Sequence, residues 1–199
     1  MLLLVLAPAS YVLGMFPSAL IVARAKGVDI TQQGSGNPGA SNISRVLGWR
    51  LGMLVFALDA AKGAIAAAMG LIVSGRPAGY ACAAAAALGH MFPIARWFGT
   101  ARFRGGKGVA TISGAMFVLQ PIVTTILAVV WFVVSRITKK ASIATFTMVP
   151  LLPIGVAIAG GAAWEIVTIV ALAALVLLRH TSNIKRLIGH DELSLDKNT

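Results

Sequence analysis

Three groups of polar and glycine residues interrupt an otherwise apolar chain of 199 residues. The first group reads Gly-Ser-Gly-Asn-Pro-Gly-Ala-Ser-Asn over residues 34–42, and an arginine follows three positions later. Glycine-rich backbone can turn several N–H groups toward one anion, and Ser, Asn and Arg side chains add further donors. A flexible turn between helices is the alternative, but such a turn needs neither two asparagines nor an arginine. We therefore predict an anion site made of Gly34, Ser35, Gly36, Asn37, Ser41, Asn42 and Arg45.

The second group reads Gly-Gly-Lys-Gly over residues 105–108 and immediately precedes a predicted helix. Glycines at this place let backbone donors approach a phosphate, and the helix N-terminus adds a favourable dipole. The nucleotide-binding loop Gly-x-x-x-x-Gly-Lys-Ser/Thr is absent. Glycines also end helices, which is the structural alternative. We predict that Gly105, Gly106, Lys107 and Gly108 bind a phosphate.

The third group, residues 179–189, directly follows the last apolar run. Arginine and lysine are expected there at the lipid headgroups, but His180 and Asn183 are not. These two side chains share a helical face if the helix continues. His90, in Gly-His-Met-Phe-Pro over residues 89–93, is interpreted equally well as a site residue or as a hydrogen-bonded helix end.

Three charged residues lie within or beside apolar runs. Asp59 and Lys62 are three positions apart, so they can pair on one helical face. Ionisable residues inside a membrane are functional candidates, although here we favour a structural pair. Glu165 is predicted to be a solvated residue in the first turn of a helix.

The elements that must position these residues are predicted to be membrane helices. The chain is 58% hydrophobic and 12% charged, with a mean hydropathy of +0.86, whereas soluble domains carry about 25% charged residues. Apolar runs of about 20 residues are typical of membrane-crossing helices. Six such runs occupy residues 2–23, 51–74, 78–94, 109–135, 141–160 and 164–178. We therefore expect an all-α integral membrane protein.

The distribution of basic residues predicts the topology. The fourth run is long and contains Pro121, where a helix breaks or kinks. If the run divides there, all of the 17 basic residues except Arg76 and Lys62 lie on the cytoplasmic side, as the positive-inside rule demands. The chain is then a single polytopic domain over residues 1–199 with about seven transmembrane helices, short glycine-rich cytoplasmic loops and a short polar tail from about residue 190. Its N-terminus is outside and its C-terminus is cytoplasmic.

Composition and missing motifs narrow the function. The net charge of +11 resides in short loops between apolar runs, so we expect no nucleic-acid partner. Only six acidic residues exist, without a carboxylate cluster, so we expect no metal and no cofactor. The sequence contains neither His-x-x-x-x-Asp, the usual motif of acyl-CoA acyltransferases, nor the nucleophile elbow Gly-x-Ser-x-Gly. A site rich in anion-binding groups and poor in bases suits phosphorylated substrates with a good leaving group.

The ordered motifs resemble those of the bacterial acyl-phosphate-dependent glycerol-3-phosphate acyltransferases. The similarity runs over residues 14–192 and includes residues 34–42, 59–63, 89–93, 105–111 and 182–187. Departures are Thr31 in place of arginine, Ser41 in place of threonine, a longer stretch over residues 93–103, and a reduced serine motif in which Ser142 is the best match.

The resemblance implies a seven-helix enzyme in the cell inner membrane, with its active site on the cytoplasmic side. A monomer is a separate expectation, which the resemblance does not carry. The enzyme would transfer a fatty acyl chain from acyl phosphate to the sn-1 hydroxyl of glycerol-3-phosphate. The products would be lysophosphatidic acid and phosphate, in the first committed step of phospholipid synthesis.

The residues of the three groups receive roles in this expected reaction. Lys107 and the 105–108 backbone would hold one phosphate and stabilise developing charge. Ser35, Asn37 and Arg45 would hold the second phosphate. His180, Asn183 and Ser142 would orient the glycerol, and a substrate phosphate oxygen would be the base. The expected catalytic residues are Lys107, Ser35, His180 and Asn183, and the expected binding residues include His90 and Arg186.

Two other classes of function are compatible with the loops. A transporter or flippase for a phosphorylated solute or lipid would use them as a gate, but transporter sites usually lie near the bilayer midplane. A purely structural membrane subunit would leave the glycine loops unexplained.

Overall fold

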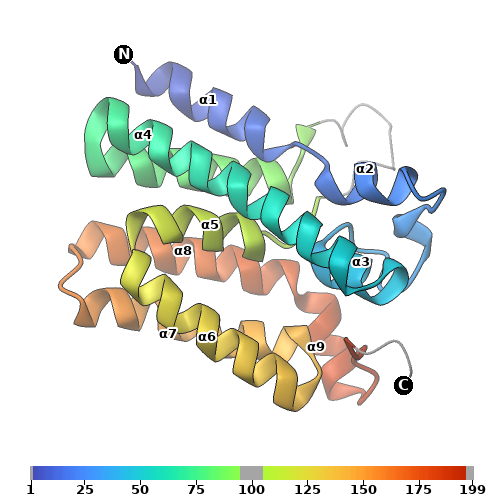
Figure 1. Cartoon of the computed structure of the whole chain (residues 1–199). Helices are drawn as coiled ribbons and strands as arrows, with labels where there is room; N and C mark the ends of the chain where they lie inside the picture. The colour runs from blue at the N-terminus through green and yellow to red at the C-terminus, as the bar shows by residue number, and fades with distance from the viewer. Residues whose placement is uncertain (1, 95–104, 196–199) are drawn as a thin grey trace. The chain divides into compact units, whose positions relative to one another are not determined.

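The regular structure is helical throughout residues 2–94 and 105–195, which are the residues that the computed structural model describes. The chain forms two compact units, Met1–Leu119 and Gln120–Thr199. Arg96, Arg102, Arg104 and Lys197, which belong to the predicted cytoplasmic charges, lie outside the described residues. The first unit contains α1 (Leu3–Gly14), α2 (Ser18–Arg24), the 3₁₀ helix η1 (Ile30–Gln32), α3 (Ala40–Leu47), α4 (Trp49–Met91) and α5 (Val109–Leu119) (Figure 1). The second contains α6 (Pro121–Thr138), α7 (Ala141–Ile158), α8 (Ala163–Arg179) and α9 (Thr181–Ile188).

The first apolar run is broken at Pro17, which the sequence analysis did not anticipate. α1 ends at Gly14 and α2 begins at Ser18, with Pro17 in a non-helical conformation (φ −91°, ψ 63°). Proline has no N–H to donate to the preceding helical turn, and its ring clashes with that turn. Residues Leu3–Arg24 are nevertheless long and apolar enough together to cross a membrane.

α4 doubles back on itself (Figure 1). Ser74 (φ −144°) and Gly75 (φ 77°) leave the helical conformation. A Cβ on Gly70 would collide with the backbone carbonyl of Ala78, although residues eight apart in a straight helix are about 12 Å apart. α4 is therefore a hairpin of two helical legs, residues 49–73 and 76–91. The prediction of separate runs over residues 51–74 and 78–94 is confirmed.

The predicted break in the fourth run is also confirmed. α5 ends at Leu119, Gln120 is non-helical (φ −140°, ψ 61°), and Pro121 opens α6. The first position of a helix tolerates proline because its missing N–H would have had no helical partner. α6 has 18 residues and α5 has 11, so the two parts are unequal.

The number of membrane crossings stays a prediction. Four helical stretches among the described residues are long and apolar enough to span a bilayer, and the bent pair of α8 and α9 is a fifth candidate. α5 is apolar but shorter than these spans. The structure thus shows an all-helical protein with apolar spans.

Glycines let the helices of the first unit approach closely. In lipid, helix association depends on van der Waals packing, which small residues permit by allowing backbones to touch. A Cβ would collide with backbone of a neighbouring helix at each of these pairs: Gly14 with Ala86, Gly89 with Tyr11, Gly63 with Thr111, and Gly114 with Ala60. The pairs join α1 to the second leg of α4, and α5 to its first leg.

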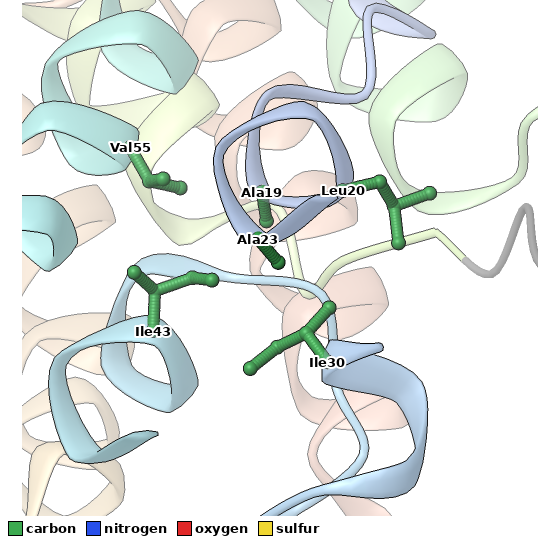
Figure 2. Close-up of a cluster of buried hydrophobic side chains, with 6 residues drawn as sticks. All are labelled: Ala19, Leu20, Ala23, Ile30, Ile43 and Val55. Carbon is green, nitrogen blue, oxygen red and sulfur yellow. The ribbon is translucent and has the colours of Figure 1, made fainter. Parts of the chain in front are cut away.

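A compact apolar cluster fixes both ends of the first glycine loop. Figure 2 shows Ala19, Leu20 and Ala23 of α2 beside Ile30, Ile43 and Val55. Ile30 precedes the loop and Ile43 follows it, and both are fully buried. The loop over residues 34–39 is therefore held in place on both sides by buried residues.

Glu165, predicted to be solvated, is instead buried. Its side chain is in the first turn of α8, where Oε2 accepts a hydrogen bond from the backbone N–H of Ala162 (3.3 Å) and one from Nε2 of Gln120 (3.3 Å). The expectation was wrong because Gln120, at the break in the fourth run, supplies a half-buried donor 45 residues away in sequence.

Candidate functional site

The first loop is organised around Asn42, whose side chain is buried. Its Oδ1 accepts a hydrogen bond from the backbone N–H of Ser35 (2.9 Å). Its Nδ2 donates to the backbone carbonyls of Ile30 (3.3 Å) and Gln33 (3.0 Å). Asn42 therefore shapes the loop from inside.

The first group, predicted as a loop that binds an anion, is part loop and part helix. α3 begins at Ala40, so Ser41, Asn42 and Arg45 lie on one short helix. Gly34 (φ 57°) and Gly36 (φ 66°) adopt left-handed conformations that other residues rarely adopt. Ser35 and Asn37 are half-buried between and after them. The loop therefore leads directly into the helix that carries Arg45.

The second loop packs against the C-terminal end of α4. The backbone N–H of Gly106 donates to the carbonyl of His90 (3.1 Å). A Cβ on Gly105 would collide with the carbonyl of Met91, and one on Gly106 would collide with the His90 ring. Gly108 has a positive φ of 84°. These glycines are thus required by packing, and they leave Lys107, half-buried, between them.

Asp59, Lys62 and His90 form a buried polar cluster beside the second loop. The ammonium of Lys62 is 2.9 Å from Oδ1 of Asp59 and 2.7 Å from Nδ1 of His90, and it donates to the carbonyl of Phe16 (3.1 Å). The predicted structural pair is confirmed. Because an ammonium only donates, Nδ1 of His90 accepts, and the hydrogen of the neutral ring is on Nε2. That nitrogen faces Gly106.

A small pocket opens beside this cluster. Its lining includes Ser18, Asp59, His90, Gly105 and Gly106. Ser18 is buried, and its hydroxyl has no hydrogen-bond partner among the described residues. Polar groups from the α1–α2 break and from the second glycine loop therefore line the same pocket.

Removal of the Lys62 charge is expected to destabilise the protein strongly. Both side chains of the pair are 4% exposed, so Lys62→Met leaves Asp59 buried without its partner, at a cost of about 3–5 kcal/mol. Thermal unfolding in detergent measures this loss. The double variant Asp59→Leu with Lys62→Met should recover much of it, and Lys26→Met, at an exposed lysine, should have little effect. Equal melting of Lys62→Met and wild type would contradict the structural role.

The second unit gathers three predicted site residues around one carboxylate, that of Glu192. Oε1 accepts hydrogen bonds from the Ser142 hydroxyl (2.8 Å) and from Nδ2 of Asn183 (2.7 Å). Oε2 accepts one from Nε of Arg186 (3.0 Å). The Glu192 side chain is fully buried and that of Arg186 is 25% exposed. The backbone N–H of Leu195, three residues later, donates to the Lys139 carbonyl (2.7 Å) and fastens this segment to the α6–α7 turn.

Glu192 is ionised at neutral pH. Burial alone would raise its pKa, but the hydrogen bonds from Asn183 and Ser142 and the charge of Arg186 outweigh burial and hold the pKa below its ordinary value. A carboxyl whose pKa falls on folding stabilises the folded protein above its unfolded pKa. That contribution is lost as the pH falls through the lowered pKa.

His180 lies at the bend of 57° between α8 and α9. Its Nδ1 is 2.7 Å from the carbonyl of Val176, and its ring meets the edge of Phe146 with a centroid distance of 5.5 Å. Asn183 lies on the first turn of α9. The sequence left open whether the helix continues to Asn183, and it does so after the bend.

Sequence analysis assigned Glu192 to a polar tail and missed its contacts with three predicted site residues. A pattern that could have drawn attention to its partners is the repeated Ser-Asn-Ile-x-Arg, over residues 41–45 and 182–186. Both copies lie on eight-residue helices and bury the asparagine. In the second copy the asparagine and arginine hold the carboxylate. Among residues 2–94 and 105–195, no group of three or more His, Cys, Asp or Glu side chains is suited to a metal.

Comparisons with known proteins identify the family. The family model described as glycerol-3-phosphate acyltransferase matches residues 3–190. The chain is 36% identical over 193 residues to the glycerol-3-phosphate acyltransferase of Bacillus velezensis, covering 96% of this chain and 97% of that one. It is 36% identical over 184 residues to that of Rhizobium meliloti, covering 92% and 87%. A crystal structure of PlsY (YgiH), an integral membrane glycerol 3-phosphate acyltransferase in its glycerol 3-phosphate form, superposes with a TM-score of 0.90 at 34% identity, over 98% and 96% of the chains. The chain therefore belongs to the glycerol-3-phosphate acyltransferase family.

Proposed function

We propose that this protein transfers a fatty acyl chain from acyl phosphate to the sn-1 hydroxyl of glycerol-3-phosphate, releasing lysophosphatidic acid and phosphate. The observation that carries the proposal is the likeness, along nearly the whole chain, to an integral membrane enzyme solved with glycerol 3-phosphate. The family makes glycerol-3-phosphate the acceptor and places the reaction in phospholipid synthesis.

The chemistry of the chain supports acyl phosphate as the donor. Acyl phosphate is a mixed anhydride whose phosphate departs readily, so the reaction needs little acid–base help from the protein. The sequence lacks His-x-x-x-x-Asp and Gly-x-Ser-x-Gly but holds two glycine-rich loops with basic side chains. Transfer then proceeds directly between the two substrates, without a covalent acyl-enzyme and without a metal.

The first unit supplies the groups that bind phosphate. Lys107, held between Gly106 and Gly108, offsets the charge that develops in the transition state. Ser35, Asn37 and Arg45 hold the second phosphate, while Asn42 positions their loop. His90 keeps Gly106 in place through the backbone bond to its carbonyl. Fixing both substrates in reactive geometry can lower a barrier by several kcal/mol.

The second unit orients the glycerol. His180, Asn183 and Ser142 contact the glycerol moiety, and a phosphate oxygen of a substrate takes the proton of the attacking hydroxyl. The protein acts as a monomer in the cell inner membrane, with seven membrane segments, an external N-terminus, and an active site and C-terminus on the cytoplasmic side.

An assay with two donors tests the reaction. Purified protein with labelled glycerol-3-phosphate is expected to form lysophosphatidic acid from acyl phosphate and none from acyl-CoA, because acyl-CoA brings no phosphate leaving group. Turnover with acyl-CoA alone would contradict the donor assignment. Absence of turnover, combined with solute uptake into proteoliposomes, would favour the transporter interpretation.

Lys107→Ala is expected to lower kcat about 10²- to 10³-fold, because it removes one preorganised charge from the phosphate site. Lys107→Arg keeps the charge but is bulkier between glycines and should rescue poorly. Lys139→Ala, at an exposed position of the α6–α7 turn, should retain most activity. Turnover at the wild-type rate by folded Lys107→Ala would show that the second loop does not bind the phosphate.

Cysteine labelling of intact cells tests the topology. In a Cys82→Ala background, a membrane-impermeant reagent should label cysteine at position 76 and leave positions 104 and 136 unlabelled, because the break at Pro121 returns the chain to the cytoplasm. Strong labelling at position 136 with none at position 104 would require a single crossing over residues 109–135. That result would contradict the count of seven membrane segments.

A further inference from the structure

The pocket beside the second loop contains a buried hydroxyl that has no protein partner. Ser18, the first residue of α2, is 1% exposed. Its Oγ is one of four buried hydroxyl oxygens without a hydrogen-bond partner among the described residues, and it is the one of the four whose residue lines the pocket. Buried polar groups in folded proteins are almost always hydrogen-bonded. The Ser18 hydroxyl therefore points to a partner in the pocket that does not belong to the chain.

Asp59 lines the same pocket. Its side chain is 4% exposed, and Oδ1 accepts a hydrogen bond from the Lys62 ammonium (2.9 Å). Nδ1 of His90 is 3.7 Å from the same oxygen, which is beyond hydrogen-bond distance. A carboxylate can accept about four hydrogen bonds, so Asp59 keeps accepting capacity beyond its bond to Lys62. Asp59 is not bonded to Ser18, because the Ser18 hydroxyl has no partner among the described residues.

The size and the charge of the pocket decide what can bridge these two groups. The pocket has a free volume of about 20 Å³. A water molecule needs roughly 10–15 Å³ on this measure and two to four polar partners, so the pocket admits one water. A phosphate or a glycerol is larger than this space, and a phosphate would also be repelled by the Asp59 carboxylate. A metal cation would be repelled by the Lys62 ammonium, which already pairs with that carboxylate.

We propose that one water molecule binds in this pocket and bridges the Ser18 hydroxyl to the Asp59 carboxylate, and that Ser18 acts through this water as a positioning residue for the second glycine loop. Water donates one hydrogen to the carboxylate and makes a second hydrogen bond with the hydroxyl, which can donate or accept. This inference rests on the proposed function, because only that function assigns the second loop to a phosphate.

The bridge completes a chain of contacts from the α1–α2 break to the second loop. Asp59 pairs with Lys62, and the Lys62 ammonium contacts Nδ1 of His90 (2.7 Å). The His90 carbonyl accepts a hydrogen bond from the N–H of Gly106 (3.1 Å), and Lys107 follows directly in the sequence. A bridging water is nearly as favourable as a direct hydrogen bond, so it keeps the Asp59 carboxylate turned toward Lys62. Loss of the bridge lets these contacts relax and displaces the Lys107 ammonium.

A crystal structure of the full-length protein, at a resolution that shows ordered water, tests the binding site without an activity assay. One water is expected within hydrogen-bond distance of both Ser18 Oγ and a carboxylate oxygen of Asp59. In Ser18→Ala this water should be absent or weakly occupied, because it has lost one of its partners. A wild-type pocket without an ordered water, or a Ser18 hydroxyl bonded to a protein group, would overturn the proposal.

Kinetics of Ser18→Ala test the positioning role. Lys107 is assigned to charge that develops in the transition state, so its displacement should lower kcat about 10-fold and leave KM for both substrates near the wild-type values. Misplacement of a catalytic group by 1 Å can cost about 10²-fold, and the expected shift is smaller. Ser18→Thr keeps the hydroxyl and should restore most of kcat.

Ser10→Ala is the matched control. Ser10, on α1, is also fully buried with a hydroxyl that has no partner among the described residues, but it does not line the pocket. The same atom is removed in both variants, so a purely structural effect would change the melting temperature alike and leave kcat unchanged. Ser10→Ala is expected to keep the wild-type kcat.

The outcomes separate this inference from the proposed function. Folded Ser18→Ala with the wild-type kcat would overturn the positioning role, as would an equal loss of kcat in Ser18→Thr or in Ser10→Ala. If Ser18→Ala does not fold, the wild-type crystal structure still decides whether the water is bound. Wild type that transfers no acyl group from acyl phosphate to glycerol-3-phosphate would overturn the proposed function, whereas the water site is judged from the crystal structure alone.

Discussion

The first unit depends on the buried ion pair and hydrogen bonds of the Lys62 ammonium. It pairs with Asp59 on its own leg of α4, contacts His90 on the other leg, and donates to the carbonyl of Phe16 at the α1–α2 break. A buried charge is tolerated only when its partners are complete. Three segments that are distant in sequence are therefore held at one point, and His90 extends this order to Gly106.

The glycines of the first unit permit close helix packing, and they also allow the second loop to pack against α4. In apolar surroundings, helices approach closely only where side chains are small, and α4 meets α1 and α5 through such positions. In the second loop, Gly105 and Gly106 fit against Met91 and His90, and the same loop presents Lys107. Packing already requires these glycines, and the proposed phosphate binding would require them too, so the motif by itself does not separate the two roles.

The second unit solves the problem of burying a charge in a different way. Glu192 is buried among donors from α7 and α9, and its charge is balanced by a half-buried arginine. Ordered donors around one anion give each donor a fixed direction. The carboxylate thereby fixes the orientation of the Ser142 hydroxyl and of the Asn183 amide.

The sequence by itself determined the class of this protein. Apolar runs, the charge distribution and Pro121 predicted an all-helical membrane protein with a broken fourth run, because hydropathy and proline act locally. The pairing of Asp59 with Lys62 was likewise predictable from helical spacing. Five ordered motifs indicated the family for the same reason: each is a short segment whose residue types are read directly.

Only the tertiary structure decided which polar groups are buried and what they face. Glu165 is buried by Gln120, and Glu192 lies 50 residues from its partner Ser142 in sequence. The break at Pro17 and the contact between His90 and Lys62 were equally hidden. Such contacts depend on how distant helices pack, and spacing along the chain carries no record of that packing. The residue types therefore indicated the chemistry, while the directions of their hydrogen bonds were decided by the fold.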